Sequence, residues 1–300
     1  MMQRFLGPLV ALSLAAPLAT QAAEPEQTSS LGGFSYHGTL SIGTTDMKPG
    51  PGIGFADVTF GVPLTSRAPL TFEFGTYLFS LDGKRPHETY AAFAWDGRYR
   101  LGALRPAYDA VLPSVFEDTA PFLAYSRAEY TRAYNTVEAM RRTAVPWGLS
   151  AEGSAGGFDW IVSLHDASKG DFRSASAALT WNGDSYRLMA AVESVWTGEN
   201  DHGATSSKFG GTYLFDRGEV GLAYLHPEAN ERPDAVAWHM RVPLADQIGM
   251  EAMGEFTEDA TDDAYGLAVD YSFREFGKVT IAATDGALHP GLHATYSLKF

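Results

Sequence analysis

The feature that most constrains this chain is a strict alternation of apolar and polar residues in short segments. The last segment shows it most clearly, because Leu292, Tyr296 and Phe300 fall on one face while His293 and Lys299 fall on the other. Residues two apart point to the same side of a strand. The pattern predicts sixteen strands, at 34–44, 53–63, 70–81, 88–96, 98–104, 146–155, 158–167, 174–182, 185–197, 208–216, 219–226, 235–243, 248–258, 263–273, 278–286 and 291–300.

The connections between these strands are alternately short and long. Every second connection is a tight turn, as at 96–97, 156–157 and 182–183, and the intervening ones are longer, as at 46–52 and 198–207. Asn-Gly and Asp-Gly favour two-residue hairpins, because both central positions take positive φ. Strands of about ten residues with short turns at one end and longer loops at the other are typical of a transmembrane β-barrel. A β-sandwich also has alternating strands, but it does not require this parity.

Aromatic residues recur beside the tight turns. Trp95 and Tyr99 flank one turn, Trp181 and Tyr186 flank another, and Phe300 closes the chain. Tyr and Trp rings collect at the headgroup level of a membrane. Packing across hairpin strands is the alternative explanation, but recurrence at one end favours a membrane girdle.

The first residues have the features of a secretory signal. Arg4 precedes a mostly apolar run, and small residues follow around Ala22. The run is too short and too interrupted to favour a membrane-spanning helix, although an N-terminal anchor is the alternative. We predict a signal peptide at 1–22 and one barrel domain at 23–300.

Composition excludes several kinds of function. The chain has no cysteine, which rules out disulfides and thiolate metal sites, and its net charge of −14 argues against nucleic acid as a partner. No His-Glu-x-x-His or Gly-x-Ser-x-Gly motif occurs, so we expect neither an enzyme nor a cofactor. The acidic segments at 199–201 and 258–263 could bind structural Ca²⁺ or bridge to lipopolysaccharide through divalent ions. Solvated acidic loops are the alternative.

One stretch, 105–145, lacks strand alternation over a length unmatched elsewhere. An insertion of this size is usually functional or disordered, and its many Tyr and Phe residues argue against disorder. Its second half, about 119–143, has helix-like content, and the stretch contains five acids and five arginines. Opposed charges of this kind can line a constriction and select ions. We therefore predict a constriction loop.

The chain resembles the general porins of Gram-negative bacteria, and among them the compact sixteen-stranded porins of photosynthetic alphaproteobacteria. The resemblance covers the whole chain after the signal peptide. It rests on the terminal Tyr296-Ser297-Leu298-Lys299-Phe300, the strand count and the long loop after the fifth strand.

This resemblance implies a bacterial outer-membrane barrel that forms a water-filled channel for passive diffusion of ions and small hydrophilic solutes. It further implies a homotrimer, an inward-folded third loop, and contact with outer-membrane lipid and lipopolysaccharide. Phe300 would be the signal that the barrel assembly machinery accepts.

The resemblance also implies a constriction in which acids on the loop face a basic cluster on the wall. The predicted acids are Asp109, Glu117 and Asp118. The predicted wall residues are Arg98, Arg100, Arg187, Arg241 and Arg274.

The first three strands depart from the family pattern. They place His37, Asp57 and Glu73 on the expected lumen face, where the family often has arginines. We therefore expect a weakly polarised constriction with a mild preference for cations. An ordinary lumen-facing charge with no special role is the alternative for each of these site residues.

Three other functions are weighed against passive diffusion. A substrate-specific channel would need an aromatic or charged ladder in the lumen, for which Tyr77 and Phe79 are weak candidates. An outer-membrane barrel enzyme would need a catalytic constellation. A soluble exported carbohydrate-binding β-protein would not need the turn parity or the terminal phenylalanine.

Overall fold

The computed structural model describes residues 29–31, 33–47, 52–81, 84–167, 169–198, 203–258, 260–273 and 276–300. The predicted signal peptide at 1–22 lies outside these residues. No helix within the described ranges is long and apolar enough to cross a membrane.

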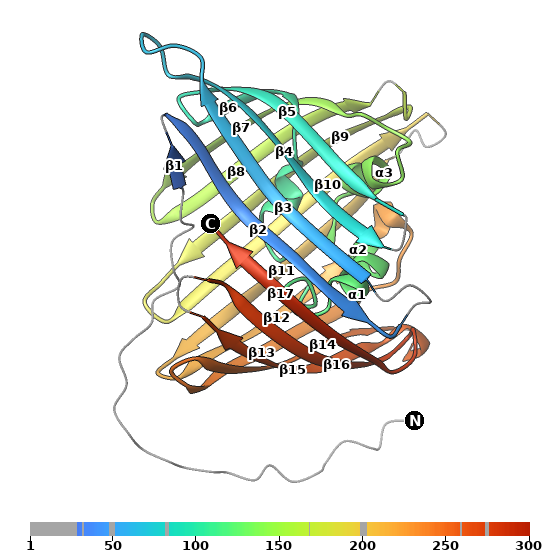
Figure 1. Cartoon of the computed structure of the whole chain (residues 1–300). Coiled ribbons are helices and arrows are strands. Elements are labelled where there is room, and N and C mark those ends of the chain that lie inside the picture. The colour runs from blue at the N-terminus through green and yellow to red at the C-terminus, as the bar shows by residue number, and fades with distance from the viewer. Residues whose placement is uncertain are drawn as a thin grey trace.

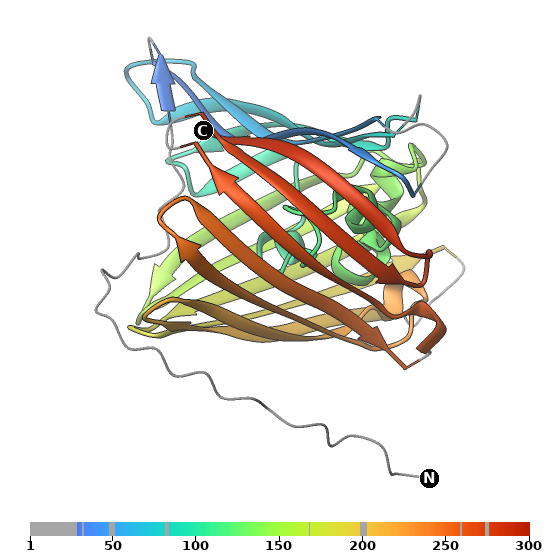
Figure 2. The same ribbon diagram turned by 60° about the horizontal axis from the view of Figure 1, so that its bottom comes forward.

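Sixteen antiparallel strands, β2 to β17, close into one barrel (Figures 1 and 2). Each strand pairs with its neighbours in sequence, and β2 pairs with β17 to complete the circle. The strands are β2 (Phe34–Thr45), β3 (Gly52–Pro63), β4 (Leu70–Leu81), β5 (His87–Trp95), β6 (Tyr99–Ala103), β7 (Trp147–Ala155), β8 (Phe158–Ala167), β9 (Phe172–Asn182), β10 (Tyr186–Thr197), β11 (Ala204–Phe215), β12 (Gly218–His226), β13 (Ala235–Ala245), β14 (Ile248–Thr257), β15 (Ala264–Ser272), β16 (Lys278–Gly286) and β17 (Gly291–Lys299).

The predicted strands are confirmed. Their ends agree with the prediction within two residues, except that β11 begins at Ala204 instead of 208. Residues 204–207 are Ala-Thr-Ser-Ser, which lack the apolar alternation that marks the other strands. A short strand that was not predicted, β1 (Ser29–Leu31), also has no such alternation.

The first described strand and the C-terminus meet at one seam. β1 pairs with Phe34–Tyr36 at the start of β2, and β17 pairs with the same strand from Thr39 onward. Between them, Phe300 and Gly38 exchange two backbone hydrogen bonds of 2.8 and 3.1 Å. The two ends of the described chain therefore complete one wall of the barrel.

The tight turns have the backbone geometry that their sequences predict. Asp96 and Gly97 have φ values of 54° and 65°, and Gly156 and Gly157 have 61° and 83°. Positive φ at both central residues is the requirement of a type I′ hairpin. These turns and Phe300 lie at the same end of the barrel, which we call the tight-turn end; the opposite end is the loop end.

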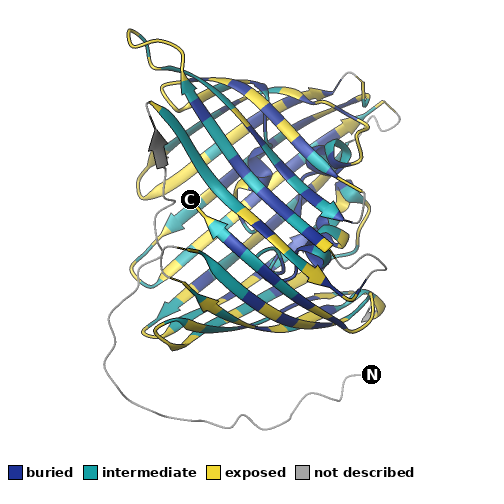
Figure 3. Ribbon diagram, in the orientation of Figure 1, coloured by how far each residue is buried: buried dark blue, intermediate teal, exposed yellow. Residues whose placement is uncertain are grey.

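The outer face of the barrel is apolar. Ile42, Leu101 and Ile281 are 68%, 63% and 62% exposed, while residues on the opposite faces of the same strands are buried or half-buried. Figure 3 shows this alternation of exposed and buried residues along the strands. Trp95 and Tyr99 are half exposed beside their turn. Soluble monomers rarely expose apolar surface this continuously.

Residues 105–145 fold into the barrel and are called the inner loop. They follow β6 and contain the short helices η1 (Ala107–Ala110), α1 (Pro121–Ser126), α2 (Ala128–Thr131) and α3 (Tyr134–Met140). Figure 2 shows them inside the wall, in the half that lies toward the loop end. The predicted inward fold and helical second half are confirmed. Two further short helices, η2 (Glu228–Asn230) and η3 (Ala260–Asp262), lie in loops outside the strands.

Candidate functional site

Apolar side chains of the inner loop pack against distant parts of the barrel wall. Tyr125 lies against Phe79 of β4, with ring centroids 5.4 Å apart. Phe116 and Leu123 form a second buried cluster with Met253 of β14 and with alanines of β15 and β16. Further clusters join the loop to β9 and β10 and to β12 and β13. The interior of the barrel is therefore a packed core at this level.

The start of the loop is held by a charged pair. Arg105 donates two hydrogen bonds to the carboxylate of Asp57 on β3, at 2.7 and 3.1 Å. Its guanidinium also lies over the rings of Tyr77 and Tyr90, 5.6 and 5.1 Å from their centroids. Two-point arginine–carboxylate pairs fix orientation as well as position. Asp57 consequently faces the lumen, as its strand position predicts.

The middle of the loop is held by a buried ion pair. Nε of Arg127 donates to Oε1 of Glu255 on β14 at 2.6 Å, and the two side chains are 3% and 0% exposed. Arg127 also donates to the backbone oxygen of Asp262, the last residue of η3, at 2.6 Å. Its guanidinium lies 4.7 Å from the centroid of the Tyr130 ring.

Two more charged wall residues bind loop backbone. Lys208 on β11 is buried, and its ammonium donates to the carbonyl oxygens of Leu112 and Thr131 at 3.2 and 2.7 Å. Glu193 on β10 is also buried and accepts a hydrogen bond from the backbone N–H of Tyr134 at 2.8 Å. The alternation places both charges on the inner face, but their backbone partners have no sequence signal.

Two of the three predicted loop acids support the loop itself. Asp109 is buried and accepts hydrogen bonds from the backbone N–H of Ala133 and the hydroxyl of Thr136. Glu117 pairs with Arg132 of the same loop and accepts a hydrogen bond from Tyr77 at 3.3 Å. Burial raises the pKa of Glu117, although Arg132 opposes this. The prediction that Asp109 and Glu117 face wall arginines is therefore wrong, because the folded loop supplies nearer donors.

Asp118 does reach a cation on the wall. Its carboxylate lies 3.1 Å from the ammonium of Lys299 on β17. Burial would raise the pKa of Asp118, but Lys299, Lys278 and, more weakly, Arg241 together lower it to about 2. Of the predicted opposed charges, the structure thus brings Asp118 and Arg241 near one another, and it adds two lysines that were not predicted.

The predicted arginines lie closer to the tight-turn end than the inner loop does. Arg98 follows a tight turn, its side chain is 66% exposed, and its nearest carboxylate is Asp96 at 4.0 Å. It precedes β6 and does not contact the inner loop, so its predicted place in the constriction is wrong. Arg187, near another tight turn, donates to the amide oxygen of Asn182 at 3.2 Å. Arg274 lies outside the described residues.

Arg100 and Arg241 each bridge two acids on nearby strands of the wall. Arg100 pairs with Glu73 and Glu152 at 2.8 and 2.7 Å. Arg241 pairs with Glu251 and Glu219 at 2.8 and 3.4 Å. These triads line a charged part of the lumen between the inner loop and the tight-turn end, which we call the vestibule.

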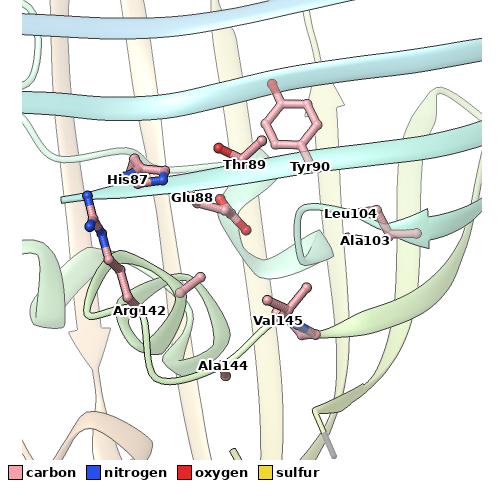
Figure 4. A pocket seen from close by; sticks show the side chains of 11 residues that line it. His87, Glu88, Thr89, Tyr90, Ala103, Leu104, Arg142, Ala144 and Val145 are labelled. Atoms are coloured by element: carbon pink, nitrogen blue, oxygen red, sulfur yellow. The ribbon is translucent and has the colours of Figure 1, made fainter. Parts of the chain in front are cut away.

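A small cavity of about 170 Å³ lies where the inner loop leaves and rejoins the wall (Figure 4). It lies between the start of β5 and the last residues of the loop, with Glu88 and Arg142 among its lining residues. Glu88 is buried and accepts a 3.4 Å hydrogen bond from Thr136. A larger polar pocket of about 400 Å³ lies between α2, α3 and η2, with Glu129, Arg141 and Arg232 in its lining.

Comparison with known proteins identifies the fold. No family model matches the chain, and no curated protein matches it. Solved structures of Rhodopseudomonas blastica porin are similar. A triple mutant of that porin has a TM-score of 0.66 at 18% identity and covers 89% of this chain and 100% of its own. A second mutant has a TM-score of 0.67 at 19% identity with the same coverage.

A third structure, from work on asymmetric conductivity of engineered proteins, has a TM-score of 0.67 at 18% identity, again covering 89% of this chain and 100% of its own. The chain therefore has the fold of a sixteen-stranded porin.

Proposed function

We propose that this chain is an outer-membrane porin, a channel for passive diffusion of ions and small hydrophilic solutes. The observation that carries the proposal is a closed barrel with an apolar outer face, a charged vestibule and a charged loop inside. Closure leaves no unpaired sheet edge, which is the condition for strands to span hydrocarbon. Solved structures of similar fold include Rhodopseudomonas blastica porin.

The outer face suits a lipid environment. Large apolar side chains such as Ile42, Leu101 and Ile281 point outward, and the tight-turn end has exposed Trp95 and Tyr99. Aromatic side chains at such a rim lie at the level of lipid headgroups. We propose that this end faces the periplasm, since short turns occupy that end of outer-membrane barrels.

The vestibule suits small ions. Each of its arginine triads contains two carboxylates for one guanidinium. The excess of acid supports a mild preference for cations. We propose a channel without turnover chemistry.

A substrate-specific channel gains no support from the proposed aromatic ladder. Tyr77 and Phe79 are both buried, with Phe79 packed against Tyr125 of the inner loop. Side chains in that position do not line an open path. Their packing favours a structural role in holding the loop.

Several further properties belong to the same proposal. We propose that residues 1–22 are a cleaved signal peptide, that three copies assemble, and that lipid and lipopolysaccharide surround the barrel. The assembly machinery would accept Phe300, whose ring lies 5.7 Å from that of Tyr36 at the seam.

A structural Ca²⁺ at the acidic segments 199–201 and 258–263 is a separate proposal. Within the described ranges, no group of three or more His, Cys, Asp or Glu is suited to a metal ion. The acidic segment at 199–201 lies outside them.

The test is single-channel recording of the refolded full barrel in a planar bilayer under a KCl gradient. We expect stepwise currents and a reversal potential of the sign that indicates cation preference. Folding is verified beforehand by the gel-mobility shift on heating. Folded, inserted protein that gives no current at any voltage, both in the wild type and in a variant whose inner loop is loosened, would rule out a channel.

A further inference from the structure

Protein atoms occupy much of the lumen at the level of the inner loop. Several long side chains on the inner faces of the strands are less than 2% exposed, namely Phe79 on β4, Lys208 on β11, Leu225 on β12, Met253 on β14 and His293 on β17. A side chain of that length in a water-filled lumen would be accessible to water. Its burial requires other protein atoms beside it, and the inner loop supplies them at Phe79, Lys208 and Met253.

The inner loop makes polar contacts with most strands of the wall. Hydrogen bonds or ion pairs join it to β3, β4, β5, β8, β9, β10, β11, β14 and β17. Buried apolar clusters extend the contact to β12, β13, β15 and β16. A loop that only narrowed a pore would lie along one part of the wall. This loop contacts wall on opposite sides of the barrel.

The docking of the loop leaves polar atoms without partners. Nη2 of Arg127 and Oε2 of Glu255 are both buried and have no hydrogen bond, and the same holds for Oε1 of Glu193. Burying a polar atom without a partner is costly, and water would satisfy these atoms if the loop moved away from the wall. The ion pair itself gains little over solvated charges, since desolvation offsets its attraction. Removing one partner of such a buried pair is strongly destabilising, because the other charge is left uncompensated, so the contact with β14 is sensitive to a change at Glu255.

The loop also has space beside it. The polar pocket lined by Glu129, Arg141 and Arg232 borders α2 and α3 on their side toward η2. The charges of this pocket are already partly exposed. The loop therefore has unfilled space beside it on the side toward η2.

Resting on the proposed channel function, we propose that the inner loop is a plug that closes the barrel in this conformation. Solutes pass when the Arg127–Glu255 pair opens and the loop moves off β14. The pair acts as the latch between the plug and the wall.

The first experiment records single channels of Glu255→Gln, which removes the charge and keeps the shape. We expect open probability to rise at least severalfold over the wild type, which should be closed most of the time. The matched control is Glu138→Gln, since Glu138 pairs with Arg141 on the exposed side of the loop and not with the wall. Steady conduction by the wild type, equal to that of Glu255→Gln, would overturn the plug.

The second experiment uses the absence of cysteine from the chain. Ala282→Cys places a thiol at a fully buried inward position of the cluster that contains Phe116 and Leu123. We expect a charged thiol reagent to react with it slowly in the wild-type background and faster with Glu255→Gln. Ser154→Cys, at an exposed position near a tight turn, should react rapidly in both. Equal rates at the two positions in the wild-type background would contradict the plug.

The two proposals fail in different ways. If Ala282→Cys becomes reactive in the Glu255→Gln background and yet no variant conducts, the plug stands and the channel function fails. If every variant conducts alike, the channel function stands and the plug fails.

Discussion

Asp118 is the residue at which the inner loop and the vestibule meet. Its carboxylate contacts Lys299, and Arg241 of the vestibule contributes to its electrostatic environment. A charge in this place affects ions passing between the two regions. Its role is therefore electrostatic, whereas Asp109 and Glu117 serve the packing of the loop.

Replacing Asp118 should weaken the preference for cations. A unit charge about 10 Å from an ion changes its energy in water by about 0.4 kcal/mol, or a factor of about two. Because the lost charge favours cations and disfavours anions by that factor each, we expect Asp118→Asn to lower the cation-to-anion permeability ratio about fourfold. The reversal potential under a KCl gradient measures this ratio. An unchanged potential would place Asp118 away from the ion path.

The same residue predicts a pH dependence of stability. Because the pKa of Asp118 is lowered from 3.8 to about 2 in the folded state, its ionised form stabilises the fold above the ordinary pKa, and this contribution is lost as pH falls toward 2. Asp118→Asn should therefore lower the thermal midpoint in detergent at pH 7 and have little effect near pH 2. A difference that stays constant across this range would contradict the prediction.

Individual charges show where sequence reasoning succeeds and where it stops. Alternation places Asp57 and Glu73 on the inner face, and both pair with arginines there. Alternation also puts Arg98 on the same face as Arg100. Arg98 nevertheless lies at the rim of the tight-turn end, whereas Arg100, two residues further along the strand, lies in the vestibule. The face of a residue follows from its own strand, whereas its partner depends on how other segments fold.

At the scale of elements, the tight turns are fully encoded locally. Asp96 and Gly97 both have positive φ, a conformation that Gly adopts readily and residues with a Cβ adopt at a cost. The inner loop differs, because its short helices have no side-chain caps and are mostly buried. Its conformation depends on the surrounding wall.

A turn substitution tests this contrast. We expect Gly97→Ala to destabilise the barrel by about 1 kcal/mol, because Ala disfavours positive φ. Gly52→Ala is the control, since no atom lies within 4 Å of the added Cβ and the backbone there is not in the left-handed region. Urea unfolding in detergent, followed by tryptophan fluorescence, measures both. Equal midpoints would show that the turn tolerates a side chain.

At the scale of the whole molecule, the seam between β2 and β17 completes the barrel. Phe300 contributes two backbone hydrogen bonds with Gly38 and a ring contact with Tyr36. Without closure, two strand edges would remain unpaired. The last residue of the chain therefore has a structural role besides its proposed role in assembly.

Deleting Phe300 separates these two roles. Loss of two hydrogen bonds at the end of a ladder should lower stability by about 1–3 kcal/mol, and refolding in detergent should still proceed. Insertion in cells should fall much further if the assembly machinery needs this residue. The fraction of heat-modifiable protein in outer-membrane preparations is compared with the yield of refolding in vitro. If the fraction inserted in cells and the refolding yield in vitro fell equally, Phe300 would have only the structural role.

The sequence by itself determined the strands, their inward and outward faces, the parity of turns and loops, and the presence of a long folded insertion. These properties are local, since side chains alternate with a period of two and a hairpin depends on a few adjacent residues. Only the tertiary structure decided that the insertion packs against opposite sides of the wall and that Arg127 meets Glu255, 128 residues away. Contacts of this kind depend on the register of the whole barrel and on the path of the loop through it, and no local pattern specifies either.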